Sequence, residues 1–303
     1  MVRIVDDITK AKFITHSGTI HADEVFATAF LDLYFGNIDL IRVNEVPNNV
    51  KDDVIIYDIG KGKFDHHQIE VKVRDNGIKY SSFGLLFEEF GLKYLEKLGL
   101  EKKEEIFNYF VKDLVEGIDA IDNGIFPKFE SNYKVKTISD VIKLFNPSYS
   151  SEDLVNDNFI KAVEIAKTII VYEIKNINGK VLASLKVKKL LEHCKDHILV
   201  LDEFLPYEET ILSSSKYDRI KLVVYPSNRG GYAVKTVPIS TTDKTSRVYF
   251  PKDWGGVFNK ELEEVTGVKG ANFCHMNRFI LTADTLESAL KLAEITIDKN
   301  ELN

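Results

Sequence analysis

The chain has 303 residues, of which 44% are hydrophobic and 29% charged, a balance typical of a globular protein rather than a disordered or fibrous one. This length is sufficient for two domains, each with its own core. The net charge of −7 excludes a protein that coats nucleic acid with a broadly basic surface, although it leaves room for a local basic cleft.

The N-terminal residues and the cysteines narrow the class of protein further. Asp6 and Asp7 lie where a secretory signal would have its apolar core, and no apolar run is long enough to span a bilayer. We therefore expect a cytoplasmic protein with no membrane partner. The cysteines, Cys194 and Cys274, lie far apart, so neither a disulfide framework nor a thiolate zinc site is predicted. Any metal must be held by nitrogen and oxygen ligands.

The first sixty residues have the pattern of an α/β sheet. The apolar run at residues 13–15 predicts a buried strand, and apolar residues then recur at helical spacing over residues 25–34. Residues 40–43 and 54–57 are continuous and rich in β-branched side chains, as strands covered on both faces are. We expect residues 1–150 to form a catalytic domain with a mainly parallel sheet flanked by helices.

More helices are predicted after this sheet. One follows Ser81 and Ser82, which can cap it, and a second runs from about residue 102 to residue 122. Residues 151–195 are almost entirely helical in pattern and predict a connector between domains, with Gly179 as its expected interruption.

The remaining residues, 196–303, predict a smaller α/β domain. Residues 220–225 and 232–237 are strand-like, and the Pro-Ser-Asn-Arg-Gly-Gly segment between them is typical of a hairpin turn. A strand, a helix, a strand and a closing helix are expected near residues 198–201, 259–265, 271–274 and 286–297. The predicted fold class is therefore α/β in both domains.

Histidines and aspartates gather where the strands of the first domain end. His16 and His21 follow the first buried strand, Asp23 lies at the loop-to-helix junction, and Asp58 comes directly after the last strand. Ligands of open α/β sheets bind at this edge, so we expect these side chains to meet. A carboxylate can face two ions, and Asp58 is our candidate for such a bridge, with His16 and His21 on one side and Asp23 and His66 on the other.

This donor set predicts two divalent metal ions. Imidazole and carboxylate ligands suit manganese, iron, cobalt or zinc better than calcium. We take manganese as the first candidate for the native metal, with magnesium, cobalt and zinc as alternatives.

The adjacent histidines His66 and His67 are expected to differ in role, because neighbouring side chains diverge. One would bind metal and the other a substrate oxygen, with Asp65 orienting a ring. Asp119 and Asp122 add two candidate ligands that the sequence does not distinguish. Each residue alone has an ordinary explanation, as a surface histidine or a turn-forming aspartate, and the metal prediction rests on their occurrence together.

Several motifs resemble those of a known family. The N-terminal motifs, which are specific in combination, are Thr15-His16-x-Gly18-Thr19-x-His21-x-Asp23-Glu24, Asp58-x-Gly60, Asp65-His66-His67-Gln68, Ser81-Ser82-x-Gly84-Leu85 and Asp119-Ala120-x-Asp122-Asn123-Gly124. Individually weaker motifs are Val237-Pro238, Ser246-Arg247, Pro251 with Trp254, Gly267-x-x-Gly270 and His275. Through these motifs the chain resembles, nearly end to end, the melanocyte proliferating gene family of exonucleases in the DHH phosphoesterase superfamily.

The resemblance implies a DHH-type domain that hydrolyses phosphodiester bonds, with 3′-to-5′ removal of nucleotides from RNA. It implies that the substrate lies between this domain and the C-terminal one. It also implies that His67 contacts the scissile phosphate, beside Asp65 and Asp58 as the other catalytic residues. The implied ligands are His16, His21 and Asp58 for one ion, and Asp23, Asp58, His66 and either Asp119 or Asp122 for the other.

The C-terminal domain is expected to bind substrate through a local basic surface. Its candidate residues share a region with Trp254 and Tyr232, which could stack on bases. The chain departs from the family pattern at Gly255, where an arginine is frequent, and after His275, where a glycine pair is frequent. The candidates for substrate binding are Arg229, Arg247, His275 and Arg278, together with His67 of the first domain.

Three functions stay open on these grounds. The first is a two-metal phosphodiesterase, a 3′-to-5′ exonuclease on RNA or short oligonucleotides that uses a metal-bound hydroxide. The second is hydrolysis of a small nucleotide or phospho-anhydride, which the acidic net charge favours slightly. The third is a non-catalytic, metal-dependent nucleotide-binding protein. Whether the chain forms a homodimer is not indicated.

Overall fold

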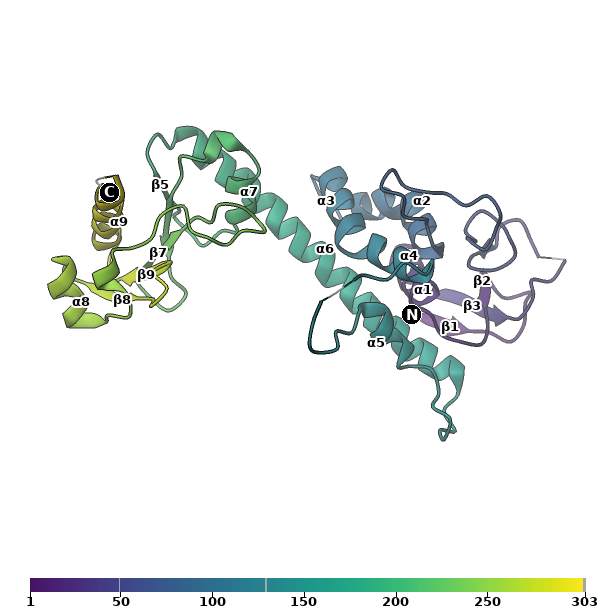
Figure 1. The fold of residues 1–303 in the computed structure, drawn as a ribbon. Coiled ribbons are helices and arrows are strands. Elements are labelled where there is room, and N and C mark those ends of the chain that lie inside the picture. Colours follow the sequence, from purple (N-terminus) through teal and green to yellow (C-terminus); the bar gives the residue numbers. More distant parts are fainter. Residues whose placement is uncertain (49, 129, 302–303) are drawn as a thin grey trace. The chain divides into compact units, whose positions relative to one another are not determined.

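The computed structural model describes residues 1–48, 50–128 and 130–301 and contains two compact units, Met1–Asn178 and Gly179–Asn303 (Figure 1). Each unit has its own sheet with helices, which confirms the predicted α/β fold class. Among the described residues, no helix is long and apolar enough to cross a membrane.

The first unit is built on a four-stranded sheet in the order β1-β3-β2-β4. Its strands are β1 (Val2–Ile4), β2 (Phe13–His16), β3 (Ile38–Val43) and β4 (Ile55–Ile56). All three pairings are parallel, as the crossover helix α1 (Ala22–Phe35) between β2 and β3 requires. The sequence pattern does not predict β1, which has only three residues. Because β2 and β4 are neighbours, the segments after His16 and Ile56 leave the same edge of the sheet.

Helices accompany this sheet, and aromatic side chains join two of them. The Phe30 ring of α1 lies 5.2 Å from the Phe87 ring and 5.7 Å from the Tyr94 ring, centroid to centroid. The remaining helices are α2 (Ser82–Lys97), α3 (Lys103–Phe110), α4 (Glu116–Asp122), α5 (Ile138–Lys143) and the first part of α6 (Val155–His193). The π-helical turn η1 (Val111–Val115) joins α3 to α4, so the helix predicted over residues 102–122 contains one wider turn.

The expected interruption at Gly179 is wrong, because α6 continues through this residue. A glycine inside a helix costs roughly 1 kcal/mol relative to alanine. The buried side chains of Ile177 and Val181 lie on either side of Gly179, and each such burial stabilises by about 1.5–3 kcal/mol. The apolar pattern therefore outweighs the glycine.

The second unit has a five-stranded mixed sheet in the order β5-β6-β7-β9-β8. Its strands are β5 (Ile198–Val200), β6 (Leu222–Pro226), β7 (Tyr232–Thr236), β8 (Ala271–Cys274) and β9 (Ile280–Ala283). Its helices are α7 (Glu208–Leu212), α8 (Asn259–Thr266) and α9 (Leu286–Glu301). Two short 3-10 turns, η2 (Ser215–Tyr217) and η3 (Lys252–Trp254), lie between them. The predicted hairpin is confirmed, because β6 pairs antiparallel with β7. Both faces of β6 are buried: Leu222 and Val224 belong to one apolar core and Val223 to another.

Candidate metal centre

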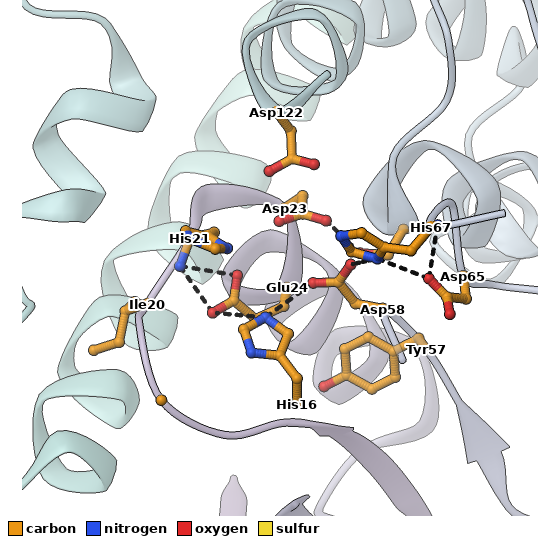
Figure 2. A network of polar contacts seen from close by, with 12 residues as sticks. His16, Ile20, His21, Asp23, Glu24, Tyr57, Asp58, Asp65, His67 and Asp122 are labelled. Atoms are coloured by element: carbon orange, nitrogen blue, oxygen red, sulfur yellow. Dashed lines mark hydrogen bonds and ion pairs between the residues drawn. The ribbon is translucent and has the colours of Figure 1, made fainter. Parts of the chain in front are cut away.

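The loop between β2 and α1 is fixed at the end that enters α1. His21 is the N-cap residue of α1, and its backbone N–H donates to Glu24 Oε1 and Oε2 at 2.8 and 3.0 Å. Ile20 is held by Asn146, whose side-chain amide accepts from Ile20 N at 2.7 Å and donates to Ile20 O at 2.9 Å. These contacts place His16 and His21 close together, with their ring centroids 5.6 Å apart (Figure 2).

Asp58 lies between two histidines that come from different segments. Its Oδ2 atom lies 3.1 Å from His16 Nε2, and its Oδ1 atom lies 3.1 Å from His66 Nε2. The residue has a φ of +56°, in a region that side chains other than glycine rarely adopt. Such strained positions cluster at functional sites. The two oxygens of one carboxylate therefore face two separate imidazoles.

Asp23 and Asp122 lie on the His66 side of Asp58. His66 Nε2 is 3.0 Å from Asp122 Oδ2 and 3.7 Å from Asp23 Oδ2. Asp23 is fully buried and is held from α2, because Ser82 Oγ donates to Asp23 Oδ2 at 2.8 Å. The start of α1 and the end of α4 therefore both carry a carboxylate to the same histidine.

His67 is more exposed than His66 and contacts Asp65. Its Nδ1 atom lies 2.9 Å from Asp65 Oδ1, which also accepts from the His67 backbone N–H at 2.9 Å. The same Nδ1 lies 3.6 Å from Asp58 Oδ1, and the side chain is 61% exposed. Asp65 is itself buried and accepts from the Lys61 backbone N–H through Oδ2 at 2.6 Å. Asp65 thus fixes the orientation of the His67 ring.

Asp119 is separated from this cluster by its partners. Its Oδ2 atom lies 2.6 Å from Arg74 Nη2, and its Oδ1 atom accepts from Ser81 Oγ at 2.5 Å and from the Gly84 backbone N–H at 3.2 Å. Of the two aspartates that the sequence does not distinguish, the geometry places Asp122 with the candidate ligands and Asp119 with Arg74.

Glu24 is part of the cluster although the sequence analysis does not name it as a candidate ligand. It is fully buried, and its Oε1 atom lies 3.7 Å from His16 Nε2 and 3.9 Å from Arg42 Nη2. A glutamate three residues after His21 is the signal that marks this position, because a capping box places its carboxylate beside the N-cap. Among the residues that the structure describes, ligand atoms lie within 4.8 Å of one another in four groups. These are His16, His21 and Glu24; Asp58, His66 and His67; His21, Asp23 and Asp122; and Asp23, Glu24 and Asp58.

The electrostatics of the cluster favour positive charge within it. Burial disfavours the charged ring of His16, but contacts with Asp58 and Glu24 outweigh it and raise the pKa of His16 to about 9. His66 is also buried, yet Asp122 and Asp58 raise its pKa to about 10. Burial and the Asp58 charge raise the pKa of Asp23 well above its usual value. Protons therefore occupy positions that metal cations could take.

The unsatisfied atoms of the cluster fit metal ligands. Among the described residues, Asp23 Oδ1, both carboxylate oxygens of Asp58 and His66 Nε2 are buried without a hydrogen bond of suitable geometry. Buried polar atoms without partners are unfavourable, and a divalent ion is a partner that all four could share. The donor set of imidazole nitrogens and carboxylate oxygens suits a transition metal.

The basic candidates of the second unit are mostly engaged within it. Arg247 Nη1 donates to the carbonyl oxygens of Tyr217 and Ile220, each at 2.9 Å. Arg278 Nη1 donates to Phe250 O at 3.0 Å. His275 Nδ1 accepts from the Asn277 backbone N–H at 3.0 Å, whereas Arg229 lies exposed in the β6-β7 turn.

Fold and site together define an α/β protein with a buried histidine and carboxylate cluster suited to divalent metal ions. The model of the family MYG1_exonuc, described as an uncharacterised protein family (UPF0160), matches residues 12–297. The chain belongs to this family, as its motifs predict; membership of the DHH superfamily stays a prediction.

The chain is also similar to several individual proteins. A MYG1 protein of Schizosaccharomyces pombe is 28% identical over 318 residues, which cover 95% of this chain and 97% of that protein. A protein of Mus musculus named MYG1 exonuclease is 27% identical over 328 residues, which cover 93% of this chain and 84% of that protein. The MYG1 exonuclease of Homo sapiens is 25% identical over 327 residues, which cover 93% of this chain and 85% of that protein. No solved structure matches the chain.

Proposed function

We propose that this protein is a metal-dependent phosphodiesterase that removes nucleotides from the 3′ end of RNA or short oligonucleotides. The observation that carries the proposal is the position of Asp58, whose two oxygens each lie 3.1 Å from a different histidine. A carboxylate in this position can bridge two ions, and paired ions are common in enzymes that cleave phosphodiesters. The names of the mouse and human relatives support an exonuclease.

The ligands that we propose form two sets that share Asp58. His16, His21 and Asp58, with Glu24 beside them, would hold one ion, and Asp23, Asp58, His66 and Asp122 would hold the other. Manganese is the metal we propose first. When bound, such a pair lowers the pKa of a water molecule and neutralises the oxygens of the phosphate.

His67 is the residue that we propose to contact the scissile phosphate. Asp65 Oδ1 accepts a hydrogen bond from His67 Nδ1, so the other ring nitrogen, Nε2, is available to a substrate oxygen. A protonated His67 would donate from Nε2 to the anionic phosphate, and Asp65 would hold the ring in that orientation. The second unit is proposed to bind the rest of the polymer, and Arg229 is the one of its candidate cations that is classed as exposed.

A second candidate function is hydrolysis of a small nucleotide or phospho-anhydride. The cavity beside the cluster has a volume of about 300 Å³. This lies at the small end of the range of about 300–1,000 Å³ for ligand sites. The cavity size therefore also suits a substrate of one or two phosphates.

The test is cleavage of single-stranded RNA labelled at its 5′ end, with manganese, magnesium, cobalt or zinc supplied in turn. Attack from the 3′ end gives a ladder of progressively shorter labelled products, whereas attack from the 5′ end releases the label in a mononucleotide at once. Asp58→Asn should lower the rate by more than the 10–100-fold that loss of an outer partner of a metal ligand causes. Asp52→Asn, a change at an exposed residue before β4, is the matched control. An inert wild-type protein with every metal would refute the proposal.

A further inference from the structure

Some residues that line the cavity beside the cluster have no part in the proposed metal binding or in the proposed contact with the scissile phosphate. Asp58, His66 and His67 contribute to its lining, and so do Phe126, Ser139 and Lys143. The last three come from the segment after α4 and from α5, outside every motif that the sequence analysis singles out. Two of the three carry groups that bind anions.

Ser139 is a buried hydroxyl that lacks a partner. Its residue is 4% exposed, and among the described residues its Oγ atom has no hydrogen-bond partner. Ser139 does not cap α5, because Thr137 holds that position and accepts from the Asp140 backbone N–H. A buried hydroxyl without a partner costs about 1–3 kcal/mol. A ligand in the cavity would supply the partner.

Lys143 forms no ion pair within 4 Å among the described residues, and the carboxylate on which its charge acts is Asp140 of the same helix. The cavity that it lines also contains the carboxylates of Asp58 and Asp122. The Lys143 backbone is fixed relative to the His21 loop, because Asn146 Nδ2 donates both to Lys143 O at 3.2 Å and to Ile20 O at 2.9 Å. The ammonium group is therefore carried by a segment tied to the candidate ligands. Its positive charge suits an anion that is bound beside metal ions.

Phe126 offers an apolar surface at the same cavity. The residue is 63% exposed, so its ring is open to a ligand that enters the cavity. Aromatic rings stack on nucleobases, and such stacking contributes about 1–3 kcal/mol per base. A ring beside an anion-binding pair matches the two chemical parts of a nucleotide.

We propose that Lys143 Nζ and Ser139 Oγ form a phosphate-binding subsite for the substrate, and that Phe126 stacks on the base of the nucleotide held there. This inference rests on the proposed phosphodiesterase function and names the part of the substrate that the cavity recognises. With a volume of about 300 Å³, the cavity takes one nucleotide.

The experiment compares Lys143→Met, Ser139→Ala and Phe126→Ala with wild type on two substrates. One is a single-stranded RNA pentamer, and the other is thymidine 5′-(p-nitrophenyl phosphate), which has a single phosphate. Lys134→Met, at an exposed lysine of the same connecting segment that does not line the cavity, is the matched control. Binding of a fluorescein-labelled RNA pentamer in calcium, followed by anisotropy, gives a readout that does not need turnover.

Lys143→Met should raise KM and the anisotropy Kd about 10-fold or more, with little change in kcat, because a charged hydrogen bond to phosphate acts before and during the reaction. Ser139→Ala should raise KM and Kd by a smaller factor. Phe126→Ala should raise KM for both substrates, because each contains a base that the ring would stack on. A KM effect on both substrates assigns the subsite to the scissile phosphate, and an effect on the pentamer alone assigns it to a neighbouring one.

Unchanged KM and Kd in Lys143→Met and Ser139→Ala, or an equal change in Lys134→Met, would overturn the inference. Failure of the proposed function has a different signature, since wild type would then cleave neither substrate. The anisotropy measurement would still report whether Lys143 and Ser139 bind the phosphate. Thermal melting of each variant separates loss of binding from loss of folding.

Discussion

Arg74 Nη2 lies 2.6 Å from Asp119 Oδ2, and the two side chains are 9% and 0% exposed. The guanidinium also stacks over the Tyr80 ring, with its central carbon 3.7 Å from the ring centroid. This buried pair joins the segment before α2 to α4, one helical turn ahead of Asp122. Asp119 therefore has a structural role, and it leaves Asp122 to face His66.

Substitution of the two aspartates of α4 should therefore have different effects, one on stability and the other on metal binding. Asp119→Asn leaves the buried Arg74 charge with only the Glu116 carboxylate, 4.0 Å from its Nε atom, and we expect a loss of about 3 kcal/mol in the free energy of unfolding. Asp122→Asn should leave stability nearly unchanged and weaken manganese binding at least 10-fold. Urea unfolding and metal content of the folded fraction measure the two effects. If Asp119→Asn lost metal while keeping wild-type stability, the assignment would be wrong.

Gly84 is a second position at which the Arg74 and Asp119 pair can be tested. A Cβ atom at Gly84 would lie 2.0 Å from Asp119 Oδ2 and 2.9 Å from Arg74 Nη2. Gly84→Ala should therefore displace the carboxylate and destabilise the protein by about 1–3 kcal/mol. Gly117→Ala in α4 is the control, because nothing lies within 4 Å of its added Cβ and alanine favours the helix. The two urea midpoints should move in opposite directions, and equal midpoints would contradict the packing argument.

The sequence predicted the part of the site that depends on strand ends. His16 and Asp58 follow apolar runs that form neighbouring parallel strands, so their proximity follows from the alternation of strand and helix. The choice between Asp119 and Asp122 did not follow, because it depends on the position of Arg74, which is 45 residues away from Asp119 in the chain. Asn146 and Ile20 are likewise joined across 126 residues by an amide that has no recognisable local pattern. Contacts between distant polar side chains leave no periodic signal.

Substitutions of Arg247 and Arg229 should distinguish an arginine that stabilises the second unit from one that is available to substrate. Arg247 donates to two backbone carbonyls between η2 and β6, so Arg247→Ala should lower the free energy of unfolding by about 1.5–3 kcal/mol. Arg229→Ala removes an exposed side chain and should change stability by no more than about 0.5 kcal/mol. Thermal melting and RNA affinity, measured for both variants, check this. Weaker RNA binding by Arg247→Ala at unaltered stability would instead support a direct role for Arg247.

Metal binding should compete with protons at His16 and His66. Burial opposes the charged rings, but their carboxylate neighbours raise the pKa values to about 9 and about 10, so at pH 7 both rings carry a proton in the metal-free protein. The stability that these contacts give the metal-free fold is fully present below the usual histidine pKa of about 6.5 and is lost as the pH rises through 9 to 10.

A divalent ion that binds to these rings must displace their protons, so manganese affinity should rise steadily between about pH 6 and pH 9. Calorimetric titration with manganese at pH 7, in two buffers of different ionisation enthalpy, should report proton release, with the two rings and the buried carboxyl groups of Asp23 and Glu24 as its sources. His193→Gln, a change at a histidine near the end of α6, should not alter the number released. Affinity that is constant over this pH range, with no proton release, would show that His16 and His66 do not bind the metal.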